Sequence, residues 1–450
     1  MSRQLVCFAA CFLCFGAFSS LVLGQVVFPA PGDEVWELVS ETGVVKASYS
    51  DRCCAVDGRN RLCVCNTGYH ADLGMRRWDG TLWWELALPD KVYSVCAGPD
   101  NIVLLGEELN LGYVRDDGYA PIEMAYFYSD CQWTTSFEDD TWVLSSGPED
   151  GLQCTNWRLG GGGWLSSPGT AYAIVYEIDA WGPESRWAVC YGDFYYQENG
   201  ADWRRLAFES APTNYVWIAQ VEPYGPRRAW AVGEDGDLYH HVDDDFYDLF
   251  EKGYPLPNGP VLRITLDRNL GVWCALGNGQ IARFDGESWA HYTCDFLSGN
   301  VQDMAFDHFE NLYVITDEMI AKMCVGWHGI EFDFWCMKET YTPGEAVGIT
   351  ALARNPSWTG ILTDLYIAYQ NKQTGELLFL PGPSREVRPV IPGLWVKRRA
   401  PVYIGYIDIG PAPDAPGEYA VLIGFVFQGR LDLFSSHIET YDITVIDSNH

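Results

Sequence analysis

A strand-like segment with an apolar or aromatic centre recurs along most of the chain at intervals of about forty residues. Each copy follows a polar turn, and an alternating run such as Val301–Phe306 precedes most of these turns. Period-two alternation on both sides of a polar turn is typical of two antiparallel strands. A repeat of this length indicates units that bury their apolar faces against their neighbours. The seven central residues are Cys63, Val103, Trp142, Trp187, Trp230, Trp273 and Tyr313.

Most units carry a second signal downstream of the first. Asp79-Gly80 and Asp285-Gly286 are followed by an aromatic residue. Asp-Gly dipeptides tolerate the positive φ angles of tight hairpins, so they join a third strand to a fourth. Four antiparallel strands in roughly 40 to 45 residues match a propeller blade. The repeats therefore predict an all-β fold with a seven-bladed β-propeller over residues 25–325.

The ends of the repeat array predict how the ring closes. The last unit leaves the pattern after residue 323 without a fourth strand, whereas residues 35–38 (VWEL) resemble residues 83–86 (WWEL) of the first unit. We expect the strand with Trp36 to pair with the last blade as its fourth strand, which leaves no open edge at the seam. The alternative is an open stack of hairpins, which would need capping units that we do not find.

The carboxyl-terminal region has a different pattern. From Glu339 the period is lost, and longer apolar strands alternate with Pro and Gly turns. About 100 residues with six or seven short strands are typical of a β-sandwich. We expect a linker at 326–340 and a sandwich at 341–447. The sandwich resembles the immunoglobulin-like accessory modules of bacterial surface proteins, in which Pro-Gly-x-Tyr also precedes a late strand, as at 416–419 here.

The repeat resembles that of bacterial secreted seven-bladed propellers, in particular the two-component-regulator-propeller type. The unit at 267–289 is the best copy, with Val272-Trp273-Cys274 as its central strand and Asp285-Gly286 before its final Trp. The resemblance implies a sensory or ligand-binding module. The chain departs from that family because it has no kinase region and no membrane span after its first residues. The sensor role is therefore not carried over.

The amino terminus predicts export. Arg3 is followed by an uncharged run over 5–23, and Val22 and Gly24 have the sizes expected before a signal-peptide cut. We expect residues 1–24 to be a signal peptide and the mature protein to be secreted, periplasmic or on the cell surface. The alternative interpretation of the same run is a membrane anchor. No later segment approaches the ~20 apolar residues that cross a bilayer, so we expect no transmembrane segment after cleavage.

Charge excludes one class of partner. The chain has 61 acidic and 29 basic residues and a formal net charge of −32. Nucleic acid is not expected as a partner, because neutralising phosphates requires clustered Lys and Arg. We expect a protein or glycan ligand at the loops around the central channel of the propeller.

Cysteine usage fits an oxidising compartment. Three of the 15 cysteines lie in the predicted signal peptide, which leaves an even number. A hairpin around residues 57–60 would set Cys54 opposite Cys63, and Cys324 and Cys336 bracket a short aromatic loop. Both pairs are predicted disulfides. The alternative near the first pair is a zinc cluster, although these cysteines lack the usual two-residue spacers: Cys53, Cys54, Cys63 and Cys65.

Acidic turns are the candidate metal ligands. Ca²⁺ prefers several carboxylate and carbonyl oxygens, and turns present such oxygens close together. The alternative is a solvated acidic surface, which needs no ion. The calcium candidates all belong to the fifth unit: Asp235, Asp237, Asp243, Asp245 and Asp248.

No catalytic motif is present. The sequence has no Gly-x-Ser-x-Gly elbow, Gly-rich phosphate loop or His-x-x-x-His pair. His240 and His241 are adjacent on a predicted strand and should face opposite ways, which makes them poor co-ligands. We expect a non-catalytic binding or adhesion protein without a cofactor. The alternative is a glycosidase or polysaccharide lyase with paired channel carboxylates, which hydrolysis needs roughly 5 to 10 Å apart.

Overall fold

Strands are the regular secondary structure of the computed structural model, and no helix occurs in the part of the chain that it describes. The expected all-β fold is therefore confirmed. No described segment forms a helix that could span a bilayer. The described residues are 28–44, 52–67, 74–88, 92–97, 102–107, 111–115, 118–122, 131–137, 140–147, 151–158, 165–167, 175–182, 185–190, 193–198, 204–206, 218–233, 235–243, 245–249, 253–255, 259–267, 269–324, 331–335, 338–354, 361–380, 387–396, 401–427 and 439–447.

Seven four-stranded antiparallel sheets make up the amino-terminal part of these residues, and we number them along the chain. Sheet 1 has β2 (Cys54–Val56), β3 (Leu62–Cys65), β4 (Gly74–Trp78) and β5 (Trp83–Ala87), and sheet 2 has β6 (Val92–Ala97), β7 (Ile102–Glu107), β8 (Leu111–Arg115) and β9 (Gly118–Ile122). Sheet 3 has β10 (Cys131–Phe137), β11 (Asp140–Gly147), β12 (Gly151–Arg158) and β13 (Leu165–Ser167), and sheet 4 has β14 (Val175–Gly182), β15 (Ser185–Cys190), β16 (Asp193–Glu198) and β17 (Arg204–Leu206). Sheet 5 has β18 (Ile218–Gly225), β19 (Arg228–Gly233), β20 (Leu238–Val242) and β21 (Asp245–Asp248). Sheet 6 has β22 (Val261–Leu266), β23 (Val272–Leu276), β24 (Ile281–Phe284) and β25 (Trp289–Tyr292), and sheet 7 has β26 (Val301–Phe306), β27 (Leu312–Thr316), β28 (Ile320–Cys324) and β1 (Val35–Ser40).

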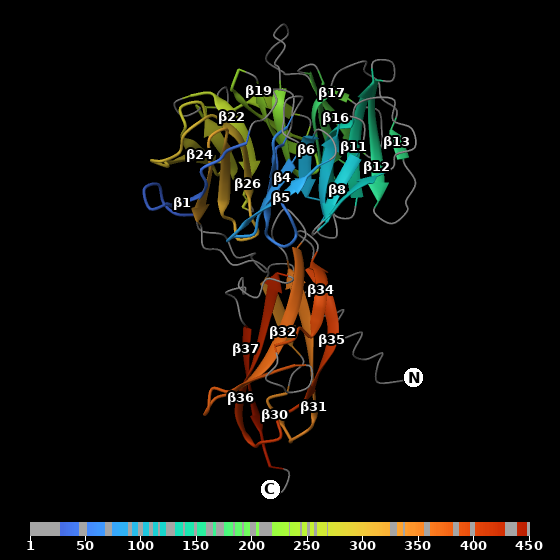
Figure 1. Ribbon diagram of the computed structural model, residues 1–450, viewed down its shortest axis with the longest axis vertical. Helices are drawn as coiled ribbons and strands as arrows, with labels where there is room; N and C mark the ends of the chain where they lie inside the picture. Colours follow the sequence, from blue (N-terminus) through green and yellow to red (C-terminus); the bar gives the residue numbers. More distant parts are fainter. Residues whose placement is uncertain are drawn as a thin grey trace.

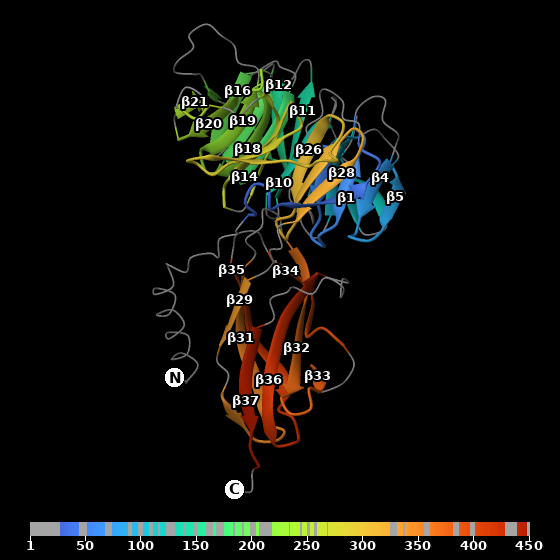
Figure 2. The ribbon, with the colours of Figure 1, turned by 90° about the vertical axis from the view of Figure 1, so that its left-hand side faces the viewer.

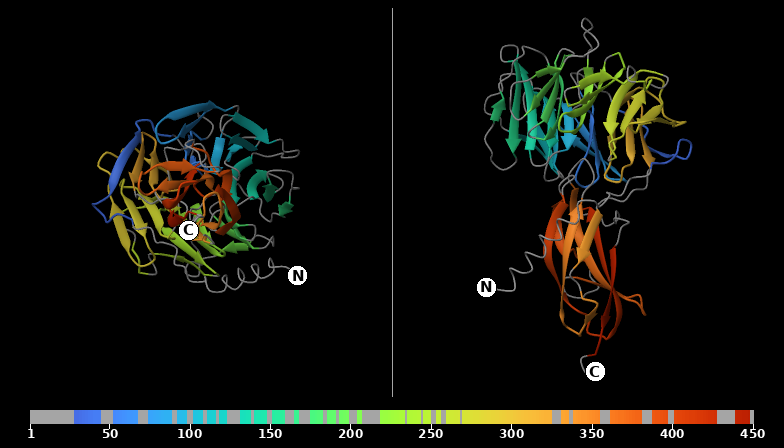
Figure 3. Two further views of the ribbon diagram at one scale, coloured as in Figure 1. Left: turned by 90° about the horizontal axis from the view of Figure 1, so that it is seen from below. Right: turned by 180° about the vertical axis from the view of Figure 1, so that it is seen from behind.

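The first strands of these sheets form a closed ring. β2, β6, β10, β14, β18, β22 and β26 contact one another in this order, and β26 contacts β2. Figure 3 (left) shows the strands of the sheets arranged around a circle. The side chains of Trp187 and Trp273 are fully buried between neighbouring sheets, as the repeated position predicts for residues that fill wedges between blades.

The seam of the ring is closed by the amino-terminal strand, as predicted. β1 pairs antiparallel with β28, and Trp36 lies opposite Met323. Trp36 also packs against the apolar cluster that contains Trp273 and Val314, so it links sheets 6 and 7. Glu37 and Lys322 form an ion pair across the same two strands at 2.7 Å. The last sheet is thereby completed to four strands.

The hairpins follow from local sequence. In the turn between β24 and β25, Gly286 has a φ of 102°. Asp285 Oδ1 accepts hydrogen bonds from the backbone N–H groups of Glu287 at 2.9 Å and Ser288 at 2.8 Å. Asp79 plays the same role between β4 and β5, where its Oδ1 accepts from Leu82 N at 2.8 Å. The Asp-Gly signal therefore marks a side chain that closes the turn.

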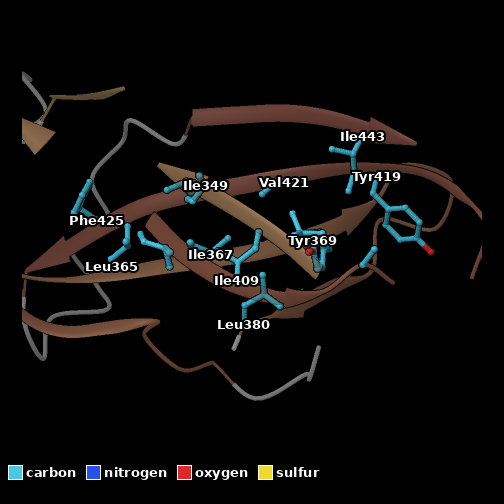
Figure 4. Packing of buried hydrophobic residues seen from close by; sticks show 14 of the residues in the cluster. Ile349, Leu365, Ile367, Tyr369, Leu380, Ile409, Tyr419, Val421, Phe425 and Ile443 are labelled. Atoms are coloured by element: carbon cyan, nitrogen blue, oxygen red, sulfur yellow. The ribbon is translucent and has the colours of Figure 1, made fainter. Parts of the chain in front are cut away.

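The carboxyl-terminal domain consists of two sheets that share one apolar core (Figure 4). Ile349 and Ile409 enter this core from one sheet, and Leu365, Val421 and Ile443 enter it from the other. The smaller sheet has β29 (Glu331–Trp335), β31 (Ala346–Arg354) and β35 (Pro401–Pro411). The larger sheet has β30 (Thr340–Tyr341), β37 (Glu439–Val445), β36 (Gly417–Phe427), β32 (Ile361–Asn371) and β33 (Leu377–Phe379), and β34 (Ile391–Val396) also pairs with β32.

The segment expected as a linker, 326–340, is partly structured. It contains β29, which pairs with β31, and Phe334 packs against the core of the carboxyl-terminal domain. The sequence accounts for this strand, because Phe332 and Phe334 alternate with Glu331 and Asp333 with the period of two that is typical of strands. This domain therefore begins earlier than the predicted residue 341.

The carboxyl-terminal domain lies against one face of the ring, with its long axis near the axis of the ring (Figures 1 and 2). The backbone N–H of Leu362 donates to the carbonyl of Gly58 at 2.8 Å, in the turn after β2. Phe309, in the turn after β26, packs against the core of this domain. The turns that follow the first strands of sheets 1 and 7 thus point toward the second domain.

Candidate functional site

Three charged side chains from distant parts of the ring meet at its centre. Arg52 directly precedes β2, Asp179 lies in β14, and Glu222 lies in β18. Arg52 Nη2 is 3.0 Å from Asp179 Oδ2 and 2.5 Å from Glu222 Oε1. In a ring of seven sheets, sheet 1 lies across from sheets 4 and 5, so the Arg52 side chain crosses the centre. We call these three residues the central cluster.

The segment that carries Arg52 is fixed by the neighbouring sheets. Asp303, in β26, accepts hydrogen bonds at Oδ2 from the backbone N–H groups of Cys53 at 2.8 Å and Cys54 at 3.2 Å. On the other side, the carbonyl of Arg52 accepts from Val95 N in β6 at 3.1 Å. These contacts hold the backbone of Arg52 between sheets 7 and 2.

The position of Asp303 has a repeated structural role. In sheet 5, Gln220 bonds both the N–H (2.9 Å) and the carbonyl (2.7 Å) of Ile264 in β22. In sheet 6, Arg263 Nε donates to the carbonyl of Gln302 at 2.8 Å. Each of these three polar residues directly follows a β-bulge in the first strand of its sheet. At three successive contacts between sheets, this residue therefore hydrogen-bonds to the first strand of the following sheet.

The acids of the central cluster, in contrast, are not repeated. Asp179 and Glu222 occupy the first-strand position that pairs with the central residue of the second strand, Trp187 and Trp230 respectively. In the other five sheets this register position holds a small uncharged residue: Ala55, Ala97, Thr135, Thr265 and Ala305. The ring can therefore be built without an acid at this position, and both acids that occur there bind Arg52.

The electrostatics of Glu222 differ from those of an ordinary surface acid. Burial raises the pKa of its carboxyl to about 7, Arg52 opposes this rise, and the negative charges of Asp179 and Asp303 add to it. Among the described residues, only Oε1 of Glu222 accepts hydrogen bonds, from Arg52 and from Gln220 Nε2 at 3.1 Å. In the part of the chain that the structure describes, two acids, Asp179 and Asp303, and the guanidinium of Arg52 act on this carboxyl.

Other buried acids of the ring serve the fold. Asp267 accepts from Trp273 Nε1 at 2.8 Å and from Arg283 Nε at 2.6 Å, both at Oδ2. Its Oδ1 accepts from the backbone N–H of Gly271 at 2.9 Å. Asp307 occupies the equivalent turn in sheet 7, where it caps Asn311 N at 2.9 Å. These acids close turns and are not candidates for ligand binding.

The five calcium candidates do not meet at one place. Asp237 precedes β20 and Asp243 follows it, at opposite ends of a strand roughly 17 Å long. Asp248 pairs with Tyr239, so it lies near the start of β20, the end where Asp235 and Asp237 also lie. Asp245 pairs with Val242 and therefore lies at the other end of β20. Burial, with the charges of Asp235 and Asp248, raises the pKa of Asp237. Within the described ranges, no group of three or more His, Cys, Asp or Glu side chains could hold a metal ion.

The predicted position of Cys54 opposite Cys63 was wrong by one residue. Cys54 pairs with Val64, and Cys63 pairs with Ala55, so the two thiols point to opposite faces of sheet 1. The turn has five residues, 57–61, with Arg61 O accepting from Asp57 N at 3.0 Å. An odd turn shifts the register by one residue relative to the expected hairpin. Both cysteines are buried free thiols.

The second predicted pair involves a residue that the structure does not describe. Cys324 ends β28 as a half-buried thiol, and burial raises the pKa of this thiol to about 11. Cys336 lies outside the described residues, so the pair with Cys324 stays a prediction.

The two adjacent histidines face opposite sides of β20, as predicted. His240 stacks on Trp230, with ring centroids 3.9 Å apart, whereas His241 Nδ1 accepts from Trp187 Nε1 at 3.1 Å. The two imidazole rings therefore pack in different interfaces between sheets, and they do not face a common metal ion.

Sequence reasoning missed the central cluster. Arg52 is 127 residues from Asp179 and 170 residues from Glu222 along the chain, and no local motif joins them. One signal was present: when the first strands are aligned on the central residues, acids stand at a position where the other units have Ala or Thr.

Comparisons with solved structures identify the fold of the ring as a β-propeller. A structure described as streptogramin B lyase is similar over 64% of this chain and 97% of that chain, with a TM-score of 0.51 and 13% identity. The extracellular domain of the one-component system BT4673 from B. thetaiotaomicron is similar over 86% of this chain, with a TM-score of 0.50 and 12% identity. This chain matches about half, 52%, of that domain. Neither a family model nor a curated protein matches the chain.

Proposed function

We propose that this chain is an exported, non-catalytic binding protein, in which a seven-bladed β-propeller is joined to an immunoglobulin-like β-sandwich. The predicted signal peptide, 1–24, supports export. The seven four-stranded sheets and their closed ring of first strands support the blade count. The two sheets around one core support the sandwich.

The observation that carries the proposal is the central cluster. Asp179 and Glu222 stand where the fold accepts Ala or Thr, and both bind Arg52 at the centre of the ring. Charged groups at a position where the other sheets have none, gathered where several blades converge, are typical of a ligand site.

The ligand surface is the face of the ring turned away from the carboxyl-terminal domain. β2 runs from Arg52 toward the turn with Gly58, which contacts Leu362 of that domain. Arg52 therefore lies at the opposite end of the strand, and its side chain is 30% exposed. A protein or glycan ligand bound at the centre of this face would contact Arg52.

The test is a binding screen with matched variants. The purified mature chain is applied to glycan and peptide arrays, and each hit is repeated with Glu222→Thr and Asp179→Ala. We expect both substitutions to weaken binding of the hit, whereas Asp243→Asn, at the far end of β20, leaves binding unchanged. Hits that bind all variants equally would place the ligand surface elsewhere.

A carbohydrate-active enzyme is the second candidate, and one observation favours it. The carboxylates of Asp179 and Glu222 share one Arg52 nitrogen, and the pKa of Glu222 near 7 suits a general acid at neutral pH. Any glycan found on the array is incubated with wild type and Glu222→Gln. Turnover by wild type that is lost in Glu222→Gln, with binding retained, would establish the enzyme; intact glycan in both leaves the binding role.

A further inference from the structure

We propose that the central cluster binds a primary ammonium or guanidinium group of the ligand, seated on Glu222 beside Arg52. This inference rests on the proposed function, because it assigns the chemistry of the same site. The group can belong to a basic side chain of a peptide or to an amino sugar.

The first argument is the charge at the centre of the ring. The carboxylates of Asp179, Glu222 and Asp303 act on one another, and Arg52 is the cation that opposes them at Glu222. The carboxylate of Asp303 is already bound by backbone N–H groups. Burial and the neighbouring acids disfavour the charged form of Glu222, so a second cation beside this carboxylate would stabilise it.

The second argument is the incomplete hydrogen bonding of Glu222. Its side chain is only 9% exposed. Oε1 is used by Arg52 and Gln220, while Oε2 has no hydrogen-bond partner among the described residues. Oε2 is also not among the fully buried polar atoms that have no partner in the described residues, so a ligand can reach it. A ligand N–H group from an ammonium or guanidinium ion would satisfy Oε2.

The third argument comes from the repeats. Arg52 shows that a guanidinium fits between the acids of sheets 4 and 5. The corresponding positions in sheets 6 and 7 hold Thr265 and Ala305, and those sheets pack into the same ring without acids. An acid is therefore not required at this position of a sheet, and the two acids that occur there both bind a cation, Arg52. The net charge of −32 also steers cationic ligands toward the protein.

The experiment uses four small probes on the mature full-length chain, measured by titration calorimetry or ligand-observed NMR. Methylguanidinium and butylammonium are the cations, and N-methylurea and butanol are their neutral analogues. We expect the cations to bind and the neutral analogues not to bind. Glu222→Thr and Asp179→Ala should weaken cation binding about tenfold, since each removes a charged hydrogen-bond acceptor.

Two controls keep the result specific. Glu222→Thr uses the residue that sheet 6 has at this position, so the variant is expected to fold, and thermal unfolding confirms this. Glu287→Thr removes an acid from the exposed hairpin between β24 and β25 and should leave cation binding unchanged. Lysine-containing peptide and glucosamine, each compared with its N-acetylated form, separate the two sources of an amine.

The outcomes separate this inference from the proposed function. Cation binding that survives both substitutions, or equal binding of the neutral analogues, overturns the inference. If the cationic probes do not bind but Glu222→Thr abolishes binding of an array ligand, the central cluster is a ligand site and the inference that it binds a cation is wrong. If the probes behave as expected and no array ligand depends on the cluster, the cation site stands without the proposed macromolecular role.

Discussion

Asp267 and Arg283 form a buried ion pair inside sheet 6, with Arg283 Nε 2.6 Å from Asp267 Oδ2. The indole N–H of Trp273 also donates a hydrogen bond to Asp267 Oδ2. In sheet 5 the residue paired with the central Trp is His240 in place of the arginine. The residue that pairs with the central Trp is therefore a charged arginine in sheet 6 and a neutral histidine in sheet 5.

Breaking this ion pair should destabilise the ring. Arg283→Met leaves the carboxylate of Asp267 buried without its main cation, so the free energy of unfolding should fall by about 3 kcal/mol. Urea denaturation of the purified chain measures the change. Arg204→Met, at an exposed site in β17, is the matched control and should change it by less than about 0.5 kcal/mol. Equal effects of the two would contradict a structural role for the pair.

Removing Trp36 should weaken the seam of the ring. Trp36→Ala takes a large side chain from the apolar cluster between sheets 6 and 7 and should cost about 3 kcal/mol. Leu82→Ala, at a side chain that is 60% exposed, is the control. Limited proteolysis should cut the Trp36→Ala variant sooner, beginning near β1. An unchanged cleavage rate would mean that β1 does not hold the ring closed.

The histidine of sheet 5 predicts a loss of stability in acid. His240 Nε2 binds the Tyr224 hydroxyl at 2.5 Å and Nδ1 binds the Tyr247 hydroxyl at 2.7 Å, and burial lowers the pKa of His240 to about 3. The unfolded chain takes up a proton at this ring below about pH 6.5, whereas the folded chain does not. Stability that His240 provides above pH 6.5 is therefore lost as the pH falls toward 3.

Thermal unfolding at several pH values measures this effect. The wild type should lose more stability between pH 7 and pH 4 than His240→Gln, which has no proton to take up at this position. His308, whose pKa burial lowers to about 4, contributes equally in both proteins and cancels from the comparison. Parallel pH curves for the two proteins would contradict the prediction.

Glu222 predicts the opposite trend. Burial raises the pKa of its carboxyl from 4.5 to about 7, so the unfolded chain releases this proton at lower pH than the folded chain. Stability is therefore lost as the pH rises from 4.5 through 7, at up to about 1.4 kcal/mol per pH unit. The free energy of unfolding of Glu222→Gln should rise relative to that of the wild type between pH 5 and pH 8, as measured by chemical denaturation. A constant difference across that range would show that Glu222 titrates normally.

The repeat predicted the fold because its signals are local. Alternation, Asp-Gly turns and the similarity of 35–38 to 83–86 depend only on neighbouring residues, and they placed β1 correctly against β28. The register at Cys54 failed because a single extra residue in the turn after β2 moves each side chain to the other face. The central cluster could not be predicted, because Arg52 meets Asp179 and Glu222 only when the ring closes.

The pairing of β1 with β28 also constrains how the protein is made. Val35 lies opposite Cys324, so the contact that completes the ring joins residues nearly three hundred positions apart. A nascent chain cannot form that contact until sheets 1 to 6 and most of sheet 7 have been synthesised. Until then the unpaired edge of β1 remains available for wrong partners. Assembly of the ring is therefore a late, slow event that favours maturation after translation is finished.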